Sequence, residues 1–138
     1  MTTRLGEHPT ETHEVVSDAD VVRVRQAVRT QAVAAKLSLI DQTKLVTATS
    51  ELARNTVTHG RGGFMEMGVV EDGLRRCVRL TFEDQGPGIE NLDLAMTDGW
   101  TSGGGLGLGL TGSKRLCNEF ELHTVPGKGT RVTIARWT

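Results

Sequence analysis

The sequence has few cysteines and lacks the common metal-binding motifs. Its 138 residues include two cysteines, Cys77 and Cys117, which form no CxxC pair. Both are expected to be reduced packing thiols, because disulfide frameworks and zinc sites need cysteines at recurrent spacings. The four histidines form no HExxH motif and have no cysteine at ligand spacing. We therefore expect no metal site built from protein side chains alone.

The chain also lacks an excess of charge of one sign and any long apolar run. It has 16 Lys and Arg against 17 Asp and Glu, a formal net charge of -1. Without a uniform basic surface, neither nucleic acid nor an anionic membrane is expected as a partner. No apolar run approaches the roughly 20 residues of a membrane helix, and residues 1–13 lack the apolar centre of a signal peptide. These absences predict a cytoplasmic protein.

The length fits one compact domain, since domains usually contain roughly 100 to 150 residues. Residues 1–13 show no periodicity and are predicted to be a flexible tail. The remaining residues, 14–138, contain no internal repeat or linker. They are expected to fold as a single domain.

Two amphipathic helices are predicted in the first half of the chain. Apolar residues recur at helical spacing over about residues 18–37, preceded by a weak capping box. Asp41 can cap a second helix, whose apolar arc runs from Leu45 to Val57. Gly60 supplies a stop signal for that helix.

The pattern then changes to the period of two that is typical of strands. Residues 64–70 and 76–84 alternate, with Asp72-Gly73 between them as a hairpin signal. Two later runs, 120–125 and 129–137, are separated by a Pro-Gly-Lys-Gly turn.

Apolar residues from Leu110 to Phe120 fit a third helix. The pattern as a whole predicts an α/β (α+β) fold, a two-layer sandwich. Its helices would lie on one face of a mixed, mainly antiparallel sheet.

A polar stripe borders the apolar arc of the second predicted helix. Glu51, Asn55 and His59 are each four residues apart and therefore share one side of the helix, facing a cleft rim. Taken alone, a Glu and an Asn at this spacing also fit an ordinary helix surface. The stripe becomes informative only together with polar groups from other elements.

Two further polar residues are predicted to point toward the covered face of the sheet. By alternation, Asp84 shares the side of Leu80 and Phe82, and Thr130 shares the side of Val132. A carboxylate that faces a core needs a partner. The alternatives are that Asp84 only starts the following turn and that the backbone satisfies Thr130. Convergence with the helical stripe nevertheless favours a ligand site.

Glycine is the largest deviation in composition, with 17 residues, seven of them within residues 99–112. Such a loop can present amide N–H groups and a helix N-terminus to phosphate oxygens. Leucines alternate with the glycines here, whereas a flexible linker would mix Gly with Ser. The predicted phosphate lid contains Gly103, Gly104, Gly105, Leu106, Gly107, Leu108 and Gly109.

Several familiar nucleotide-binding architectures do not fit the sequence. Gly107, Gly109 and Gly112 match GxGxxG, but no predicted strand immediately precedes them, which argues against NAD. The sequence has no GxxxxGK[ST], HRD or DFG motif. Any use of ATP therefore needs another architecture.

Four motifs in chain order resemble those of the Bergerat fold, the ATPase fold shared by gyrase, Hsp90, histidine kinases and MutL. They are ELARN from Glu51, DQGPG from Asp84, the glycine stretch 103–109 and GKGT ending at Thr130. The resemblance covers about residues 14–137. The small size and several local stretches are similar to the RsbT-like stressosome switch kinases, which are anti-sigma-factor-type serine/threonine kinases.

The resemblance implies a role for each candidate at the phosphate end of the site. Asn55 would hold the Mg²⁺ that bridges the ATP phosphates, and Glu51 would orient or deprotonate the attacking hydroxyl. His59 would help to bind phosphate, and residues 103–109 would close over the phosphates. These parts suit phosphoryl transfer, which needs positioning and charge neutralisation more than covalent chemistry.

At the base end, the resemblance implies that Asp84 accepts a hydrogen bond from the adenine amino group, with Thr130 in support. Gly86 and Gly88 would let the chain pass close to the base. The implied substrate is a serine or threonine of a STAS-domain protein, with a PP2C-type phosphatase as a second partner. A nucleotide-gated binding module and a detached histidine-kinase catalytic domain remain open as alternatives.

Overall fold

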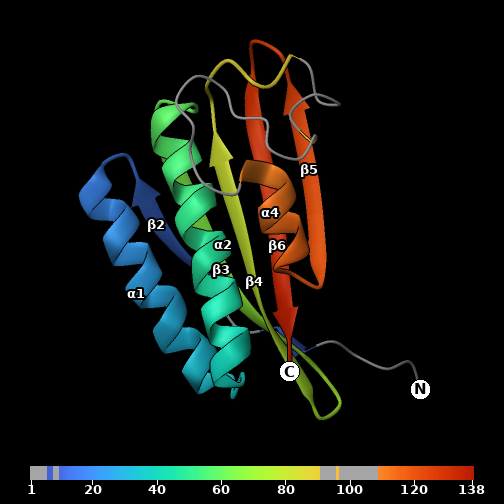
Figure 1. The fold of residues 1–138 in the computed structure, drawn as a ribbon. Coiled ribbons are helices and arrows are strands. Elements are labelled where there is room, and N and C mark those ends of the chain that lie inside the picture. Colours follow the sequence, from blue (N-terminus) through green and yellow to red (C-terminus); the bar gives the residue numbers. More distant parts are fainter. Residues whose placement is uncertain (1–5, 8–9, 91–95, 97–108) are drawn as a thin grey trace.

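A computed structural model describes residues 6–7, 10–90, 96 and 109–138, and the structural statements below concern these residues (Figure 1). No helix among them is long and apolar enough to cross a membrane. The elements in chain order are β1 (Gly6–Glu7), β2 (Glu11–Val15), α1 (Asp18–Ala34), α2 (Leu39–Thr58), β3 (Gly63–Asp72), β4 (Arg75–Asp84), α4 (Gly109–Arg115), β5 (Glu119–Val125) and β6 (Gly129–Trp137).

The helices lie on one face of a sheet whose strand order is β1-β3-β4-β6-β5, with β2 also paired to β3 (Figure 1). This confirms the predicted two-layer α/β architecture with a mainly antiparallel sheet. Every pairing between the described strands is antiparallel, so the mixed character expected from the sequence is wrong for them. The reason is topological: β6 lies between β4 and β5 and runs antiparallel to both.

The N-terminal segment differs from its prediction as a tail. Residues 11–13 belong to β2, in which Glu11 to Val15 pair with Met67 to Gly63 of β3. Val15 at the end of the strand is fully buried. Most of the other β2 side chains are exposed, so the strand depends on pairing with β3 rather than on an apolar face of its own.

Both long helices begin at serine caps. The Ser17 hydroxyl accepts a hydrogen bond from the Asp20 amide, as the capping box predicts. The Asp20 carboxylate accepts one from the amide of Val16, one residue before the cap. The end of α1 lies at Ala34 rather than near residue 37. Lys36 has a φ of 67°, a left-handed conformation that cannot continue a right-handed helix.

The start of α2 corrects the prediction that Asp41 caps it. The cap is Ser38, whose hydroxyl accepts a hydrogen bond from the Asp41 amide at 3.1 Å. Asp41 lies in the first turn and instead accepts hydrogen bonds from Arg136 Nε and Nη2 at 3.0 and 2.7 Å. Arg136 also donates to the Leu116 carbonyl. One guanidinium therefore connects β6 to the start of α2 and the segment after α4.

We expect Asp41→Ala to lower the free energy of unfolding by about 2 kcal/mol at neutral pH, because charge-assisted hydrogen bonds are lost. The Arg136 hydrogen bonds hold the pKa of Asp41 below its ordinary value of 3.8. The contribution is therefore complete well above pH 3.8 and disappears as pH falls through the lowered folded-state pKa. Urea unfolding at several pH values measures it, with Asp18→Ala as the control for an exposed first-turn aspartate. Equal effects of both substitutions would contradict the assignment.

The strands of the central hairpin are longer than the alternating pattern indicates. β3 and β4 pair from Gly63–Asp84 to Asp72–Arg75, which leaves Gly73 and Leu74 as the turn. The third predicted helix is shorter, because α4 ends at Arg115 and Phe120 lies in β5. Phe120 still packs against the core from the strand, which explains why its apolar character fitted the helical pattern.

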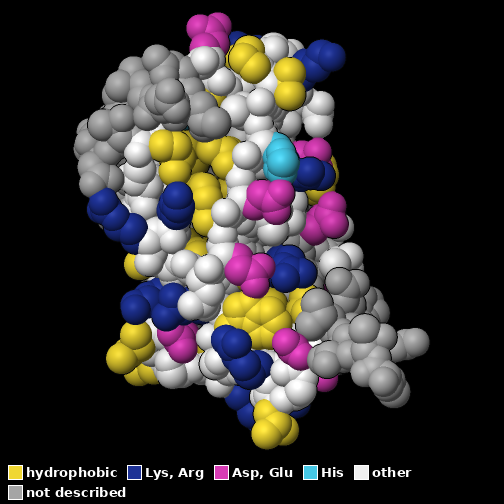
Figure 2. Space-filling view, turned by 90° about the vertical axis from the view of Figure 1, so that its right-hand side faces the viewer, with side chains coloured by type: hydrophobic (Ala, Val, Ile, Leu, Met, Phe, Trp, Pro, Cys, Tyr) yellow, Lys and Arg dark blue, Asp and Glu magenta, His cyan; other side chains and the backbone are white. Residues whose placement is uncertain are grey.

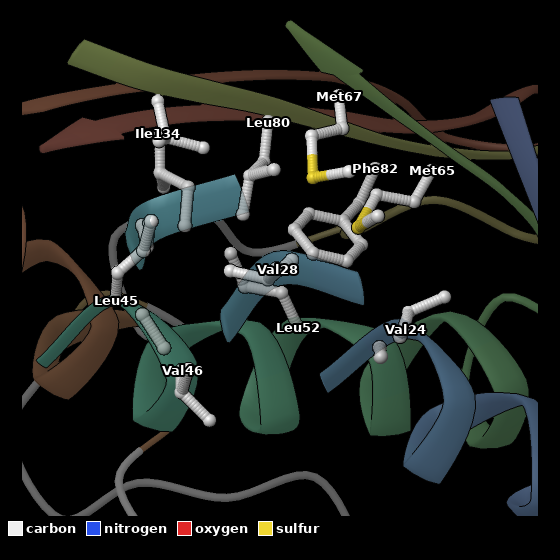
Figure 3. Packing of buried hydrophobic residues seen from close by; sticks show 14 of the residues in the cluster. Val24, Val28, Leu45, Val46, Leu52, Met65, Met67, Leu80, Phe82 and Ile134 are labelled. Carbon is white, nitrogen blue, oxygen red and sulfur yellow. The ribbon is translucent and has the colours of Figure 1, made fainter. Parts of the chain in front are cut away.

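One main hydrophobic core fills the space between the helices and the sheet (Figure 3). Helix residues such as Leu45 and Leu52 face strand residues such as Met65, Leu80 and Ile134, and all of these are at most 2% exposed. A smaller cluster lies apart from it, with Val70, Cys77 and Ala135 buried and Trp137 packed against them.

Charged side chains of both signs are interspersed on the face shown in Figure 2. Opposite charges are also paired across strands, as between Arg79 of β4 and Glu119 of β5 at 3.2 Å. The described residues of that face therefore carry no continuous region of one sign. The small cluster at Trp137 includes a cation–π contact, with the Arg75 guanidinium carbon 5.1 Å from the ring centroid.

Candidate functional site

Asp84 and Thr130 lie at one end of the sheet, next to the residues that follow α2. The C-terminal end of α2, the end of β4 and the start of β6 lie together there (Figure 1). Asp84 at the end of β4 is opposite Thr130 of β6 in the register. A Cβ atom on Gly60, just beyond α2, would lie 2.4 Å from the Asp84 carboxyl carbon. The Asp84 side chain therefore lies against the backbone that follows α2.

Asp84 occupies a partly desolvated position. Burial raises the pKa of its carboxyl above the ordinary value, and hydrogen bonds from the Gly86 and Thr130 backbone amides act in the opposite direction. The Gly86 amide donates to Asp84 Oδ1 at 2.9 Å. Asp84 thus both points toward the end of α2, as alternation predicts, and forms the turn of the alternative interpretation. The two interpretations are compatible, because Oδ1 accepts the hydrogen bond of the turn while Oδ2 lies next to Gly60.

The Thr130 hydroxyl belongs to a short polar chain on the β5–β6 hairpin. It lies 3.0 Å from the Thr124 hydroxyl, which accepts a hydrogen bond from the Ile89 amide at 2.8 Å. Sequence reasoning missed Thr124. The register of the hairpin, in which Val125 pairs with Gly129, could have identified it as the neighbour of Thr130.

Gly60 was recognised from the sequence only as a helix stop, yet it is the residue that admits the Asp84 carboxylate. We expect Gly60→Ala to lower the free energy of unfolding by about 1–3 kcal/mol, because a methyl group would overlap that carboxylate. Gly68→Ala is the control, since the one described atom that a Cβ there would meet is the Thr10 methyl carbon, at 3.1 Å. Equal thermal stability of Gly60→Ala and the parent chain would contradict this placement of Asp84.

Glu51 lies deeper than the cleft rim to which the helical stripe assigned it. Only 6% of the residue is exposed. Its Oε1 atom accepts a hydrogen bond from Arg54 Nη1 at 3.2 Å. Its Oε2 atom is buried and has no hydrogen-bond partner among the described residues. An unpartnered buried carboxylate oxygen is costly, so it marks a position where a ligand or proton donor can act.

Asn55 and His59 follow Glu51 on α2, and both are half-buried. The Asn55 carbonyl accepts hydrogen bonds from the His59 and Gly60 amides at 2.8 and 3.0 Å. These bonds terminate the helix at the position where Gly60 meets Asp84. The backbone thereby fixes the position of the end of α2 relative to the Asp84 carboxylate.

Gly86 and Gly88 are required by packing within the chain. A Cβ on Gly86 would lie 2.7 Å from the Gly60 carbonyl oxygen. Gly88 has a φ of 72°, and a Cβ there would lie 2.5 Å from the Val125 carbonyl oxygen. These contacts give both glycines a packing role within the chain, because neighbouring backbone excludes side chains there. Their closeness to the adenine base stays a prediction.

The predicted phosphate lid falls largely outside the described residues. Gly103, Gly104, Gly105, Leu106, Gly107 and Leu108 are not part of them. Gly109 is the first residue of α4 and has a φ of 64°, a conformation that favours glycine.

The described residues contain no group of three or more His, Cys, Asp or Glu side chains placed to hold a metal ion. The oxygen donor that the helical stripe offers besides the predicted base Glu51 is the Asn55 amide, one turn further along α2. A donor set this small suits Mg²⁺, which keeps most of its water and phosphate ligands.

Comparison with protein families agrees with this fold. The histidine kinase-, DNA gyrase B- and HSP90-like ATPase family matches residues 40–137, which include every candidate from Glu51 to Thr130. The chain therefore belongs to this family of ATPases, and its nucleotide is ATP.

Within that family, the chain is 38% identical to the serine/threonine-protein kinase RsbT of Bacillus subtilis (strain 168). This match spans 123 residues, 89% of this chain and 92% of the relative. The chain is therefore a member of the RsbT-type serine/threonine-protein kinases, which confirms the resemblance seen in the motifs.

More distant similarities extend to anti-sigma factors. The anti-sigma F factor of Clostridium kluyveri is 32% identical over 103 residues, 72% of each chain. That of Clostridium novyi (strain NT) is also 32% identical, over 76% of this chain and 80% of the relative. The crystal structure of the RsbU and RsbW domains of Rv1364c from Mycobacterium tuberculosis has a TM-score of 0.64 and 20% identity. It covers 94% of this chain, which spans 32% of that longer chain, and it supports the fold.

Proposed function

We propose that the chain is a cytoplasmic, ATP-dependent protein kinase that phosphorylates a serine or threonine of a STAS-domain partner. The observation that carries the proposal is the Glu51 carboxylate, buried on α2 with one oxygen that has no partner within residues 10–90 and 109–138. A protein hydroxyl needs such an acceptor when it attacks a phosphoryl group. Kinship with RsbT supports the class of reaction.

In the proposed reaction, the substrate hydroxyl oxygen forms a bond to the γ-phosphorus of ATP. The bond from that phosphorus to the β,γ-bridging oxygen breaks, and ADP leaves. Glu51 Oε2 accepts the hydroxyl proton or orients the hydroxyl. This oxygen is out of contact with solvent, so neighbouring groups must move before the hydroxyl can approach it.

Asn55 and His59 would act at the phosphates. The Asn55 amide oxygen is placed one turn from Glu51 and would hold Mg²⁺ beside the triphosphate. The metal, when bound, neutralises phosphate charge. His59 at the end of α2 would contact a phosphate, and residues 103–109 would close over the phosphates through their amides.

Asp84 would recognise the adenine. Its carboxylate would accept a hydrogen bond from the exocyclic amino group, with the Thr130 and Thr124 hydroxyls in support. Guanine carries a carbonyl oxygen where adenine carries that amino group, so the carboxylate would select against GTP. Gly86 and Gly88 would maintain the shape of the wall behind the base.

The RsbT relationship supports a proposal for the regulatory partners. A kinase of this type would bind a STAS-domain protein, phosphorylate it and leave, and the released kinase would activate a PP2C-type phosphatase. A nucleotide-gated binding module without kinase activity is the second candidate function. The similarity to proteins named anti-sigma F factor favours it, because that name describes binding.

Incubation of the purified chain with Mg-ATP and each STAS-domain protein of the same genome tests the proposal. Mass spectrometry should find one phosphate on a serine or threonine of one STAS protein, stable to acid. Acid-labile phosphohistidine would indicate a histidine-kinase domain instead. Nucleotide-dependent complex formation without phosphorylation would support the binding-module alternative.

A further inference from the structure

We infer that Arg54 is a positioning residue for Glu51, and the inference rests on the proposed role of Glu51 in phosphoryl transfer. The two residues lie three positions apart on α2. Arg54 Nη1 contacts Glu51 Oε1 at 3.2 Å. The Arg54 side chain is 41% exposed and that of Glu51 8% exposed, so the arginine reaches from the surface to a buried carboxylate.

The contact is one-sided. An arginine can engage both oxygens of a carboxylate through its planar fork. Here Arg54 contacts Oε1, whereas Oε2 is buried without a partner in the part of the chain that the structure describes. Rotation about the terminal torsion of a glutamate is soft, so a carboxylate without a fixed oxygen would turn freely. The arginine therefore fixes the carboxylate while leaving Oε2 for the substrate hydroxyl.

Helix α1 contains a matched pair that serves a different purpose. Arg23 Nη1 contacts Asp20 Oδ1 at 2.6 Å, also three positions apart. The other oxygen, Asp20 Oδ2, accepts a hydrogen bond from the Val16 amide at 2.9 Å. Both oxygens of that carboxylate therefore have a partner, one in the ion pair and one at the start of the helix. The pair on α2 differs because Glu51 Oε2 accepts no hydrogen bond from the described residues.

A purely structural role for Arg54 is a poor explanation of this arrangement. Ion pairs with a substantially exposed partner contribute little to stability. The Arg54 contact also leaves a buried oxygen unsatisfied, which a stability role would not require. The free-energy cost of the unsatisfied oxygen is offset only if Oε2 acquires a hydrogen-bond partner during the reaction.

A double-mutant cycle tests the inference. The rate of phosphoryl transfer at saturating Mg-ATP is measured on the STAS-domain protein identified by mass spectrometry. Arg54→Met should lower this rate about 10- to 100-fold, the range that partners of directly acting groups show at metal sites. The dissociation constant for ATP, measured by calorimetry, should stay unchanged. Arg54→Lys should restore most of the rate, because a cation remains.

The decisive comparison is made in the Glu51→Gln background. There Arg54→Met should cause no further loss, because residues that act as a unit are not additive. The same fold loss in both backgrounds would show a structural role and overturn the inference. A rate for Arg54→Met equal to that of the parent chain, with Glu51→Gln impaired, would overturn it while leaving the proposed function intact. Full activity of Glu51→Gln would contradict both the inference about Arg54 and the proposed role of Glu51.

Two controls keep the result interpretable. Arg23→Met removes the matched pair on α1 and should leave the rate of phosphoryl transfer unchanged. Thermal unfolding should show that Arg54→Met remains folded. If it does not fold, the same cycle with Arg54→Lys applies: a partial loss that disappears in the Glu51→Gln background supports positioning, and an equal loss in both backgrounds refutes it.

Discussion

Replacing Glu51 by Gln should lower the rate of phosphoryl transfer by about 10²- to 10⁴-fold, the contribution that general bases usually make. The substitution keeps the size of the side chain and an oxygen that Arg54 can contact, but it removes the ability to accept a proton. The affinity for ATP should change little, because Glu51 acts on the hydroxyl rather than on the nucleotide. Single-turnover phosphorylation and calorimetry measure the two quantities separately.

The matched control for Glu51→Gln is Glu66→Gln. Glu66 is a half-buried carboxylate of β3 that pairs with Thr81. By alternation with the buried Met65 and Met67, it faces the side of the sheet opposite the helices. This variant should phosphorylate the partner at the parent rate. A Glu51→Gln enzyme as fast as the control would exclude Glu51 as the base. If Glu51→Gln loses ATP affinity in proportion to its loss of rate, Glu51 binds the nucleotide rather than acting on the hydroxyl.

The second large effect is expected at Asp84. Asp84→Asn should weaken ATP binding by about 10- to 100-fold, because a hydrogen bond to a charged group typically contributes ~1.5–3 kcal/mol. The loss should be smaller for GTP, since an asparagine amide can donate to the guanine carbonyl. The preference for ATP over GTP should therefore fall, and calorimetric titration with each nucleotide measures this ratio.

Glu83→Gln provides the control for Asp84→Asn. Glu83 is the preceding residue of β4 and, by alternation, faces the opposite side of the sheet. Its substitution removes the same charge without touching the site. If both variants bind ATP like the parent chain, Asp84 has no role in base recognition. If both lose affinity equally, the effect comes from net charge.

The sequence predicted most elements because their patterns are local. The helices and strands follow apolar periodicity, and Ser17 caps α1 through the Asp20 amide as expected. The start of α2 was also predictable in principle, because Ser38 and Asp41 stand three residues apart, which is the spacing of a capping box. The prediction that Asp41 is the cap placed the start of the helix too late.

What the sequence could not predict depends on distant contacts. The five residues of β2 are mostly exposed and form a strand because β3 supplies the hydrogen-bonding edge. Gly86 and Gly88 signal close packing, but the sequence cannot tell whether a ligand or the backbone of Gly60 and Val125 is the neighbour. The burial of Glu51 likewise requires the packed helices and sheet.

The candidate site was also predictable from the sequence only where local patterns determine it. Alternation correctly predicted the side to which Asp84 points, because the strand continues through it. The contact of Arg54 with Glu51 was overlooked although their spacing is visible in the sequence. Such i,i+3 pairs are common on helix surfaces, and only the burial of one carboxylate distinguishes this pair.

The most direct test of the central claim is a crystal structure of the chain with Mg²⁺ and a non-hydrolysable ATP analogue. The adenine amino group should lie within hydrogen-bonding distance of the Asp84 carboxylate, and the metal should contact the Asn55 amide oxygen. The γ-phosphate should lie close enough to Glu51 for a hydroxyl to fit between them. A nucleotide bound elsewhere, or this region filled by side chains with nucleotide absent at saturating concentration, would contradict the account.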